Sequence, residues 1–437
     1  MPSTPGTPHM TRRRFLGVTA AVAAPFILPT SARGANDRIA MGCIGVGGRG
    51  TGVMRGFMGC EGLQVVAVCD VQQDRRERAR QLVEAHDARG SGKAKHEGCL
   101  ACADFREILA RKDVDAVLIA PQDHWHGPVA VRAARAGKDI YCEKPLGVAV
   151  ADGQAIRQAV RRYGCIFQTG TQQRSSRNFR HACELARNGY LGKLHTVQVA
   201  APGPSYQRAY RGPAGPQPVP AGLDYDMYVG PAPMKPYNPG RLAWPDWYLI
   251  WDYCAGFIVN WGVHHLDIAH WGCPSIGRTA FELTCKATYR NDGLTDNVSG
   301  WQAEFHFTDG LRMSFSDTGH PHKQGCRFEG DEGWVHVNRS GIWAEPASLL
   351  KVALKAGETH LHLSTHHQDD FLKAVRARRD PVSPVEAGYV ASTLGLLGDV
   401  AARVGRSVKW DWTAERFVDD DAADRLLSRA MRAPWTL

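Results

Sequence analysis

Glycines and an aspartate near the start of the chain have the residue types and spacing that bind a dinucleotide. The glycines follow an apolar run and fit the pattern G-x-G-x-x-G; the cluster comprises Gly45, Gly47, Gly48, Arg49 and Gly50. Such glycines allow a tight turn and let the backbone approach a pyrophosphate, which the next helix N-terminus stabilises. Asp70 ends the next apolar run, where a carboxylate binds ribose hydroxyls and repels a 2′-phosphate. The spacing predicts NAD, while Arg75 and Arg76 leave NADP as an alternative.

A lysine stands where a proton could be moved. Lys144 follows the apolar run 139–142 and precedes Pro145. The carboxyl ends of parallel strands face the ligand crevice. A lysine beside a cationic nicotinamide ring would have a lowered pKa, which suits a proton shuttle for a sugar hydroxyl. The alternative is an ordinary surface lysine at the start of a loop.

Three histidines and an aspartate gather between residues 260 and 271. His264 and Asp267 are three residues apart, so they are neighbours on one helical face. A histidine can take a hydroxyl proton during hydride transfer, and an aspartate can orient it. A metal site is the competing interpretation. However, His264, His265 and His270 do not share one face, and no Cys or Glu completes a ligand set, so no metal is expected.

The segment 244–253 is rich in aromatic and acidic side chains. Aromatic faces stack on sugar C–H surfaces, and carboxylates bind hydroxyls. The segment therefore predicts contacts with a carbohydrate, with Trp251 and Tyr253 as candidates. An aromatic patch at a domain or subunit interface is the alternative.

Positioning the glycines, Asp70 and Lys144 requires strands that all point one way. Continuous apolar runs at 39–44, 65–69, 114–119 and 139–142 alternate with helical stretches, among them 74–85 and the helix that Pro128 opens and Gly137 ends. This order predicts an α/β domain with a doubly wound parallel sheet, the Rossmann arrangement.

The pattern changes after about residue 163. Residues 202–240 are rich in proline and glycine and predict a long ordered loop. Alternation at 301–307 and 311–315 predicts antiparallel strands with one covered face. Residues 368–405 have a helical pattern, with a small apolar face formed by Ala387, Val390, Ala391, Leu394 and Leu397. We therefore expect a first domain at 36–165 and a second α/β domain at 166–437.

The N-terminus predicts export. Arg12, Arg13 and Phe15 precede the apolar run 18–29, and small residues follow at Ala32 and Ala35. Residues 1–35 therefore resemble a twin-arginine signal, which exports folded proteins to the periplasm or beyond. An ordinary secretory signal or a short amphipathic extension is the alternative. No later run is long enough to span a bilayer.

Composition excludes several classes of protein. The 437 residues are 43% hydrophobic, so they can bury a core, and global disorder is excluded. The net charge is +9, but acids follow the bases closely, as in 74–78, so nucleic-acid binding is not indicated. Several of the 12 cysteines lie in apolar runs and are expected to be buried thiols. For the close pair Cys99 and Cys102, chance or a local disulfide is favoured over metal.

These motifs, in this order and spacing, resemble the Gfo/Idh/MocA (glucose–fructose oxidoreductase/inositol dehydrogenase) family. The glycine cluster, Glu143-Lys144-Pro145 and the segment 262–267 carry that resemblance, while 123–126 and 168–174 are similar to its exported twin-arginine branch. The resemblance spans about 37–411. It implies a Rossmann domain and a C-terminal α/β domain whose large, mostly antiparallel open sheet lines the site and often the oligomer interface, so a homodimer or homotetramer is expected.

The resemblance also implies roles for single residues. Lys144 would be the acid/base or orienting lysine, and His264 the second catalytic group. Expected cofactor contacts are Gly45, Gly47, Gly48, Arg49, Gly50, Asp70, Gln122, His124, Trp125, His126, Glu143 and Lys144. Expected substrate contacts are Gln172, Arg174, Trp251, Tyr253, Asn260, His264, His265 and Asp267. Many members carry Asp where Asn260 stands. Since an amide cannot act as a base, either Asn260 only positions substrate or the proton goes through Lys144 and His264 alone.

The implied activity is an NAD(P)-dependent sugar or polyol oxidoreductase acting on a small carbohydrate. Outside the cytoplasm there is no pool of nicotinamide nucleotide, so we expect a tightly bound cofactor that is recycled in place. One alternative is a redox-neutral glycosidase that works by oxidation, elimination, hydration and reduction. Another is a non-catalytic module that binds nucleotide or glycan.

Overall fold

The computed structural model describes residues 38–89, 98–205, 207, 209–317 and 324–437. The predicted signal at 1–35 lies outside the described residues. Over the described ranges, the structure has no helix with the length and apolar character needed to cross a membrane.

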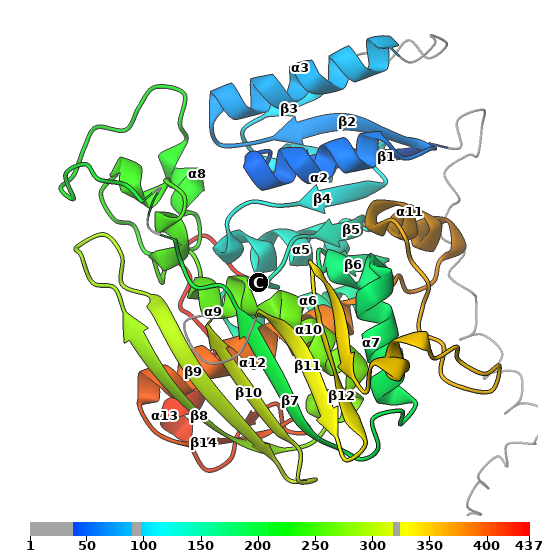
Figure 1. The fold of residues 1–437 in the computed structure, drawn as a ribbon. Helices are drawn as coiled ribbons and strands as arrows, with labels where there is room; N and C mark the ends of the chain where they lie inside the picture. Colours follow the sequence, from blue (N-terminus) through cyan, green and yellow to red (C-terminus); the bar gives the residue numbers. More distant parts are fainter. Residues whose placement is uncertain (1–37, 90–97, 206, 208, 318–323) are drawn as a thin grey trace, which may run out of the picture. The chain divides into compact units, whose positions relative to one another are not determined.

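A parallel sheet of six strands forms the first domain (Figure 1). Its order is β3-β2-β1-β4-β5-β6, with β1 Ile39–Ile44, β2 Leu63–Cys69, β3 Leu100–Cys102, β4 Ala116–Ile119, β5 Asp139–Cys142 and β6 Phe167–Thr169. The predicted doubly wound sheet is confirmed. Strand order reverses between β1 and β4, and such a switch point opens a crevice at the carboxyl ends of the strands. The sheet extends past residue 165, where the sequence places the domain boundary.

Helices cover both faces of this sheet, so its strands are mostly apolar. They are α2 Gly48–Met58, α3 Gln73–Arg89, α4 Phe105–Ala110, α5 His126–Arg135 and α6 Val150–Tyr163. Helix α2 packs on one face through Met54 and Phe57, while α5 and α6 pack on the other. Helix α5 begins before Pro128, since proline fits in the first turn of a helix.

A sheet of nine strands forms the second domain. Its order is β13-β12-β11-β7-β10-β9-β8-β14-β15, with β7 Leu194–Ala201, β8 Phe281–Tyr289, β9 Val298–Phe307, β10 Arg312–Asp317, β11 Gly325–Gly330, β12 Gly333–Asn338, β13 Gly341–Glu345, β14 Val408–Asp411 and β15 Arg416–Phe417. All pairs are antiparallel except β7 with β10, as expected for a mostly antiparallel sheet. Residues of β9 alternate between buried and exposed, so one face is covered and the other is open.

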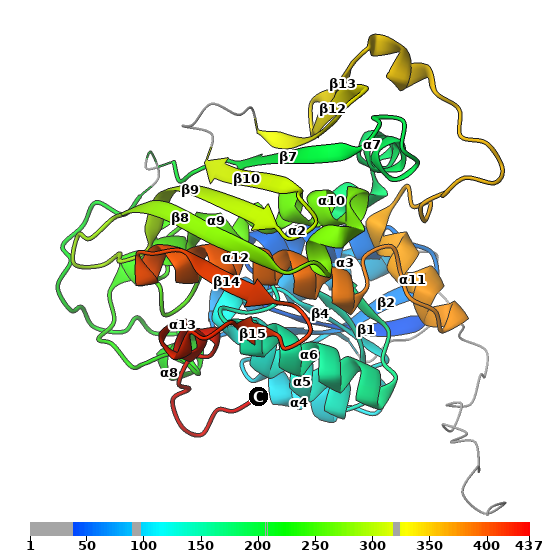
Figure 2. The ribbon, with the colours of Figure 1, turned by 90° about the horizontal axis from the view of Figure 1, so that it is seen from below.

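Helices from three separate stretches of the second domain pack on the covered face of this nine-stranded sheet (Figure 2). The helices of the second domain are α7 Arg177–Arg187, α8 Tyr225–Val229, α9 Gly256–Asn260, α10 Gly262–Gly272, α11 His367–Ala377, α12 Val385–Val404 and α13 Asp421–Asp424. Helix α10 packs on β7 and β11, and α12 packs on β8 as well as on α6 of the first domain.

The helical tail predicted at 368–405 is two helices. Helix α11 ends at Arg378, which has a φ of +50°, and α12 begins after Pro384. The apolar face predicted for α12 is buried in the core, whereas α11 packs against the first domain through Phe371. The loop predicted at 202–240 has one α-helix, α8, among its described residues.

All 12 cysteines lie in described parts of the chain, and each is a free thiol. The local disulfide considered for Cys99 and Cys102 is therefore not formed. Ten of the thiols are buried, as expected for cysteines in apolar runs; Cys60 and Cys285 are partly exposed.

Candidate functional site

The glycine-rich turn follows β1 and leads directly into α2. Gly45 has a φ of +81°, and a Cβ built on it would lie 2.3 Å from the backbone nitrogen of Pro121. A Cβ on Gly50 would lie 1.8 Å from the carbonyl oxygen of Gly45. Both positions require glycine, because backbone touches backbone there. Helix α2 has no side-chain cap at its N-terminus, so its first N–H groups remain for an anionic ligand.

Asp70 directly follows β2, and its carboxylate accepts hydrogen bonds from backbone N–H groups after β1 and after β2. Its Oδ2 accepts a hydrogen bond from the backbone N–H of Val46 at 3.0 Å, and its Oδ1 accepts one from Gln72 at 2.9 Å. Burial raises the pKa of Asp70, and these donors and Arg75 oppose the rise. The Arg75 guanidinium lies 3.1 Å from where a Cβ of Gly47 would be. Asp70 and Arg75 have opposite effects on a 2′-phosphate.

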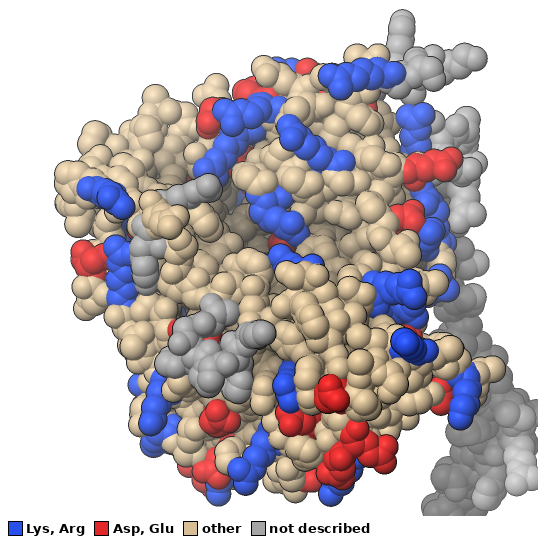
Figure 3. Space-filling model, viewed as in Figure 1, with Lys and Arg blue, Asp and Glu red and all other residues tan. Residues whose placement is uncertain are grey.

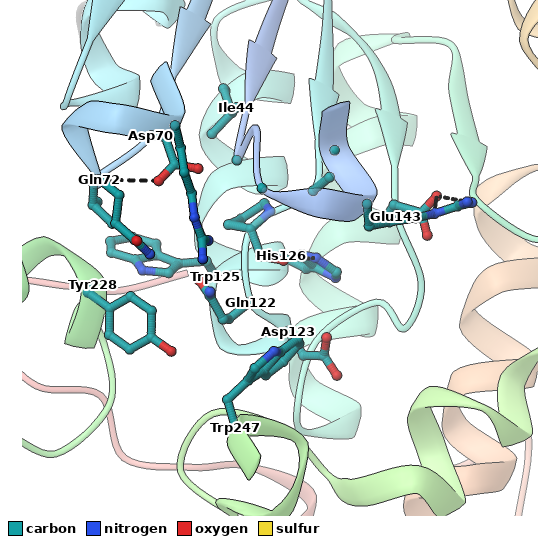
Figure 4. Close-up of a pocket in the computed structure, with 18 of the residues that line it drawn as sticks. Ile44, Asp70, Gln72, Gln122, Asp123, Trp125, His126, Glu143, Tyr228 and Trp247 are labelled. Carbon is teal, nitrogen blue, oxygen red and sulfur yellow. Dashed lines mark hydrogen bonds and ion pairs between the residues drawn. The ribbon is translucent and has the colours of Figure 1, made fainter. Parts of the chain in front are cut away.

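A cavity of about 480 Å³ opens where the strands of the first sheet end (Figure 4). From the first domain its lining includes Gly45, Gly47, Gly48, Arg49, Gly50, Asp70, Gln122, Asp123, Trp125, His126, Glu143 and Lys144. From the second domain it includes Met227, Tyr228, Trp244, Trp247, Tyr248 and Asn260. The space-filling view shows basic side chains beside a hollow on this face (Figure 3). Every residue predicted at the cofactor lines this cavity except His124.

The carboxylate of Glu143 has one oxygen that is hydrogen-bonded and one that is free to bind a ligand. Its Oε1 accepts hydrogen bonds from Arg49 Nε at 3.0 Å, Arg49 Nη2 at 2.7 Å and Gln172 Nε2 at 3.0 Å. Its buried Oε2 has no partner among the described residues. Together with the glycine turn and the open helix N-terminus, this unpaired acceptor at the cavity fits a cofactor that brings hydroxyl or amide donors.

A segment of the second domain closes over the cavity; we call residues 222–229 the strap. The Gln73 N–H donates to the Gly222 oxygen at 2.9 Å, and the Asp224 N–H donates to the Val71 oxygen at 3.0 Å. The Trp125 Nε1–H donates to the Met227 oxygen at 3.0 Å. The strap is therefore hydrogen-bonded to the end of β2 and to the loop after β4.

His124 also contacts the strap, but it does not line the cavity. Its ring nitrogens lie 3.1 Å from the Tyr228 oxygen and 3.3 Å from the Tyr253 oxygen. Burial lowers the pKa of His124 to about 4, so the ring is neutral. The geometry gives His124 contacts with the backbone in place of the expected contact with the cofactor.

Lys144 joins the two domains at the floor of the cavity. Its Nζ donates to the backbone oxygen of Asn260 at 2.9 Å and to Oδ1 of the same residue at 2.5 Å. Asn260 Nδ2 in turn donates to Oδ1 of Asp123 at 3.1 Å and to Oδ2 at 2.9 Å. Burial lowers the pKa of Lys144, and Glu143 and Asp123 oppose that effect. Lys144 can therefore lose its proton more readily than an exposed lysine.

His264 lies in the first turn of α10, with 6% of its surface exposed. Its ring packs against Trp261 at 5.5 Å between centroids, and its Nδ1 has no hydrogen-bond partner among the described residues. Burial lowers the pKa of His264, and the charge of Lys144 lowers it further. His264 is therefore a neutral imidazole near Lys144, although it does not line the cavity.

The expected pairing of His264 with Asp267 is wrong. Asp267 accepts hydrogen bonds from Arg174 Nε and Nη2, each at 2.7 Å, and both residues are buried. The Arg174 guanidinium also lies over the Trp271 ring, 5.0 Å from its centroid. This ion pair joins α10 to the loop before α7. It occupies both side chains that were predicted to contact substrate.

We expect Asp267→Asn to lower the free energy of unfolding by about 3–5 kcal/mol, because it leaves the Arg174 charge buried without a counter-ion. Urea denaturation measures this. Glu84→Gln, which removes an exposed pair with Arg80, is the matched control and should leave the free energy of unfolding nearly unchanged, because water screens exposed ion pairs. A variant that loses turnover at unchanged stability would instead place Asp267 in the substrate site.

The other predicted substrate residues are divided. Asn260 lines the cavity. Gln172 does not line it, but it donates a hydrogen bond to Glu143, which does. His265 is fully buried beside Phe179. Trp251 lies between the Arg403 and Arg429 guanidinium groups, 4.6 Å and 3.9 Å from its ring centroid.

Tyr253 is also fully buried, in an aromatic cluster with Tyr228. The aromatic side chains of this segment that line the cavity are Trp244, Trp247 and Tyr248. The two members chosen from the segment, Trp251 and Tyr253, are not among the residues that line the cavity, and its contact with a carbohydrate stays a prediction.

Asp123 is the functional candidate that sequence reasoning missed. It begins η2 (Asp123–Trp125), a short 3₁₀ helix after β4, and it is 2% exposed. It stands first in the motif 123–126, of which only the two histidines and the tryptophan were predicted to contact the cofactor.

No three His, Cys, Asp or Glu residues in the described ranges are placed to hold a metal ion.

Comparison with known families assigns both halves of the chain. Residues 39–171 match the Gfo/Idh/MocA model described as oxidoreductase family, NAD-binding Rossmann fold. Residues 178–437 match the companion model, described as oxidoreductase family, C-terminal alpha/beta domain.

Curated relatives carry several activities. Similar proteins include myo-inositol 2-dehydrogenase from Thermotoga maritima, 29% identical over 38% of this chain and 46% of its own. A glycosyl hydrolase family 109 protein from Stenotrophomonas maltophilia is 29% identical over 46% of this chain and 43% of its own. The chain thus spans less than half the length of these two relatives. A 1,5-anhydro-D-fructose reductase from Ensifer adhaerens is 23% identical over 74% of this chain and 87% of its own.

Among solved structures, the aldose-aldose oxidoreductase from Caulobacter crescentus, complexed with glycerol, is similar in fold. It has a TM-score of 0.61 and 20% identity, over 85% of this chain and 99% of that one. At this identity the likeness concerns the fold.

Proposed function

Because the chain belongs to the Gfo/Idh/MocA oxidoreductase family and its residues 39–171 are the NAD-binding Rossmann domain, we propose that it oxidises a hydroxyl group of a carbohydrate or polyol. The observation that carries the proposal is Lys144, a lysine with a lowered pKa that lines the same cavity as Glu143, whose Oε2 has no partner among the described residues. The group that receives the hydride must lie in this cavity, which residues of both domains line.

Gly45 to Gly50, Asp70 and Glu143 would hold NAD, which supplies a hydride acceptor when bound. The neutral amine of Lys144 takes the hydroxyl proton as the carbon gives up its hydride, so an alcohol becomes a carbonyl and Lys144 becomes an ammonium. Asn260 Oδ1 accepts a hydrogen bond from that ammonium. His264 is a neutral imidazole near Lys144, but it does not line the cavity, so no contact with the substrate hydroxyl is assigned to it.

We propose further that the cofactor stays bound through the whole cycle. The strap supports this. If the strap moved away to release the cofactor, its main-chain hydrogen bonds to Val71 and Gln73 would break and the buried Tyr228 would become exposed. A second sugar would then take the hydride back. Asp70 favours NAD for this role, while Arg75 leaves NADP as the alternative.

A retained cofactor suits export, and we propose that residues 1–35 direct the folded, loaded protein through the twin-arginine route. A protein loaded before export would work where no nicotinamide nucleotide is supplied. We also propose a homodimer or homotetramer through the open face of the second sheet.

A redox-neutral glycosidase is the second candidate, and similarity to glycosyl hydrolase family 109 proteins favours it. Oxidation of a glycoside hydroxyl acidifies the neighbouring C–H, the aglycone is eliminated, water adds, and reduction restores the alcohol. Lys144 and the retained cofactor would serve this cycle equally well, since it needs no second sugar.

Proton NMR of the protein, purified with its own cofactor, distinguishes these reactions. It is incubated in deuterated water with simple glycosides and no added nucleotide. We expect intact glycoside and at most one equivalent of keto-sugar. Cleaved glycoside, with deuterium beside the oxidised carbon, would establish the glycosidase. Protein that purifies without nucleotide and binds none would contradict both and favour a glycan-binding module.

A further inference from the structure

A carboxylate lies one side chain away from the lysine that moves the proton. Both oxygens of Asp123 accept hydrogen bonds from Nδ2 of Asn260, at 3.1 Å and 2.9 Å. Oδ1 of the same amide accepts one from Lys144 Nζ at 2.5 Å. Asp123 and Asn260 are each 2% exposed, so water does not compete for these contacts. The three side chains form a line from the first domain, through the second, and back to the first.

The carboxylate determines which way the Asn260 amide faces. An ionised carboxylate accepts hydrogen bonds and donates none, so it must face the NH₂ of the amide. The amide oxygen is then turned toward Lys144. With the amide reversed, its NH₂ would face the lysine ammonium, donor against donor, and its oxygen would face the carboxylate. A reversed amide would lose every hydrogen bond in this line.

The Asp123 carboxylate accepts hydrogen bonds from two side chains of the second domain that lie in the described ranges. The Cys254 thiol donates to Oδ2 at 3.0 Å, in addition to the Asn260 amide. Burial raises the pKa of Asp123, and the charges of His126 on α5 and Lys144 after β5 oppose that rise, as do the hydrogen bonds from Cys254 and Asn260. Cys142 on β5 and Tyr248 of the aromatic segment also face the carboxylate. The groups that act on Lys144 are Glu143, Asp123, Arg49, Cys254 and His264. The hydrogen bonds that the Cys254 thiol and the Asn260 amide donate favour the ionised form of the carboxylate.

We propose that Asp123 is a positioning residue for Lys144. Its carboxylate holds the Asn260 amide with the oxygen toward Nζ, and it supplies the negative charge that stabilises the ammonium formed when Lys144 takes a hydroxyl proton. No proton passes through Asn260. The amide therefore transmits a charge that a carboxylate at position 260 would supply directly. This inference rests on the proposed function only for its catalytic consequence, because the Asp123–Asn260–Lys144 line stands on its own geometry.

The test measures the titration of Lys144 without any substrate. Competitive acetylation with acetic anhydride at a series of pH values, read by mass spectrometry of the peptide that carries Lys144, gives its midpoint in the full-length holoprotein. We expect Asp123→Asn to lower that midpoint by about one pH unit, since it removes a nearby negative charge. The exchanged variant Asp123→Asn/Asn260→Asp, with the same groups in reversed positions, should return the midpoint to the wild-type value or above it.

Asp139→Asn is the matched control. Asp139 is a buried aspartate at the amino end of β5, paired with Arg378 at 2.6 Å. Its neutralisation should leave the Lys144 midpoint unchanged. Carbohydrate oxidation supplies a second readout: in Asp123→Asn the acidic limb of the pH–rate profile should move to lower pH, with a maximal rate about tenfold lower.

A midpoint unchanged in Asp123→Asn, or one that the exchanged variant fails to restore, would overturn the proposal. If Asp123→Asn does not fold, the exchanged variant decides alone, and a midpoint below that of the wild type overturns the inference. A shifted midpoint in a protein that oxidises no carbohydrate would support Asp123 and reject the proposed function. An unshifted midpoint in an active enzyme would do the reverse.

Discussion

Replacement of Lys144 by methionine is expected to lower the turnover number by about 10²–10⁴-fold, the range that general acid–base groups contribute. Methionine keeps the length of the side chain but cannot take the hydroxyl proton. Rapid-mixing absorbance of the bound cofactor measures the step directly, since it follows reduction by the first sugar. The cofactor should remain bound, because Gly45 to Gly50 and Asp70 are untouched.

The pH dependence of the wild-type enzyme follows from the same residue. Oxidation needs the neutral amine, and burial lowers the pKa of Lys144. The rate should therefore rise with pH through a midpoint below the value of about 10.4 for an exposed lysine. The methionine variant should lack this limb.

Lys144→Arg separates proton transfer from charge. Arginine keeps a cation next to Asn260 but does not deprotonate in proteins. We expect this variant to be as slow as Lys144→Met. Turnover within about threefold of the wild type would show that position 144 needs only a positive charge, and would contradict its role as a base.

The second large effect is expected at the glycine turn. In Gly50→Ala the added Cβ would lie 1.8 Å from the carbonyl oxygen of Gly45, which is too close, so the first turn of α2 must move away from the glycine-rich turn. Because those N–H groups are the ones that would bind the pyrophosphate, we expect affinity for NAD to fall by more than about 100-fold. The variant should purify without nucleotide. Isothermal titration calorimetry measures the affinity, and circular dichroism checks that the fold is kept.

Gly52→Ala on the same helix is the control for Gly50→Ala. Gly52 is exposed, and a Cβ there would have no atom within 4 Å. That substitution should leave NAD bound and stabilise the helix by up to about 1 kcal/mol. Loss of NAD in both variants would mean that helix propensity, and not the contact with Gly45, determines the affinity.

The sequence was sufficient for the sheet of the first domain and for the parts of the site that depend on it. Apolar runs such as 114–119 become parallel strands because both of their faces are buried. Residues at the ends of such strands must then meet at one edge, which is how Asp70 and Lys144 come to line one cavity. These predictions needed only local pattern and one topological rule.

Contacts between distant segments could not be predicted in this way. The spacing of His264 and Asp267 places them on one helical face, but it does not exclude a stronger partner from elsewhere. Arg174, 93 residues earlier in the chain, binds the carboxylate with two hydrogen bonds. The aromatic segment combines a short 3₁₀ helix, η6 (Asp246–Leu249), with irregular backbone on both sides of it, so it has no single period from which the side chains at the cavity could be predicted.

A strap that keeps the cofactor bound, as proposed, would also limit the kinetics of the enzyme. If the cofactor cannot leave while Gly222 and Asp224 remain bonded to the end of β2, reduction and reoxidation must happen in one place, one after the other. The first product has to depart before the second sugar arrives. Donor and acceptor would then compete for a single pocket, and double-reciprocal plots would give parallel lines. An excess of either sugar would inhibit the other half-reaction, so the ratio of the two sugars would set the flux.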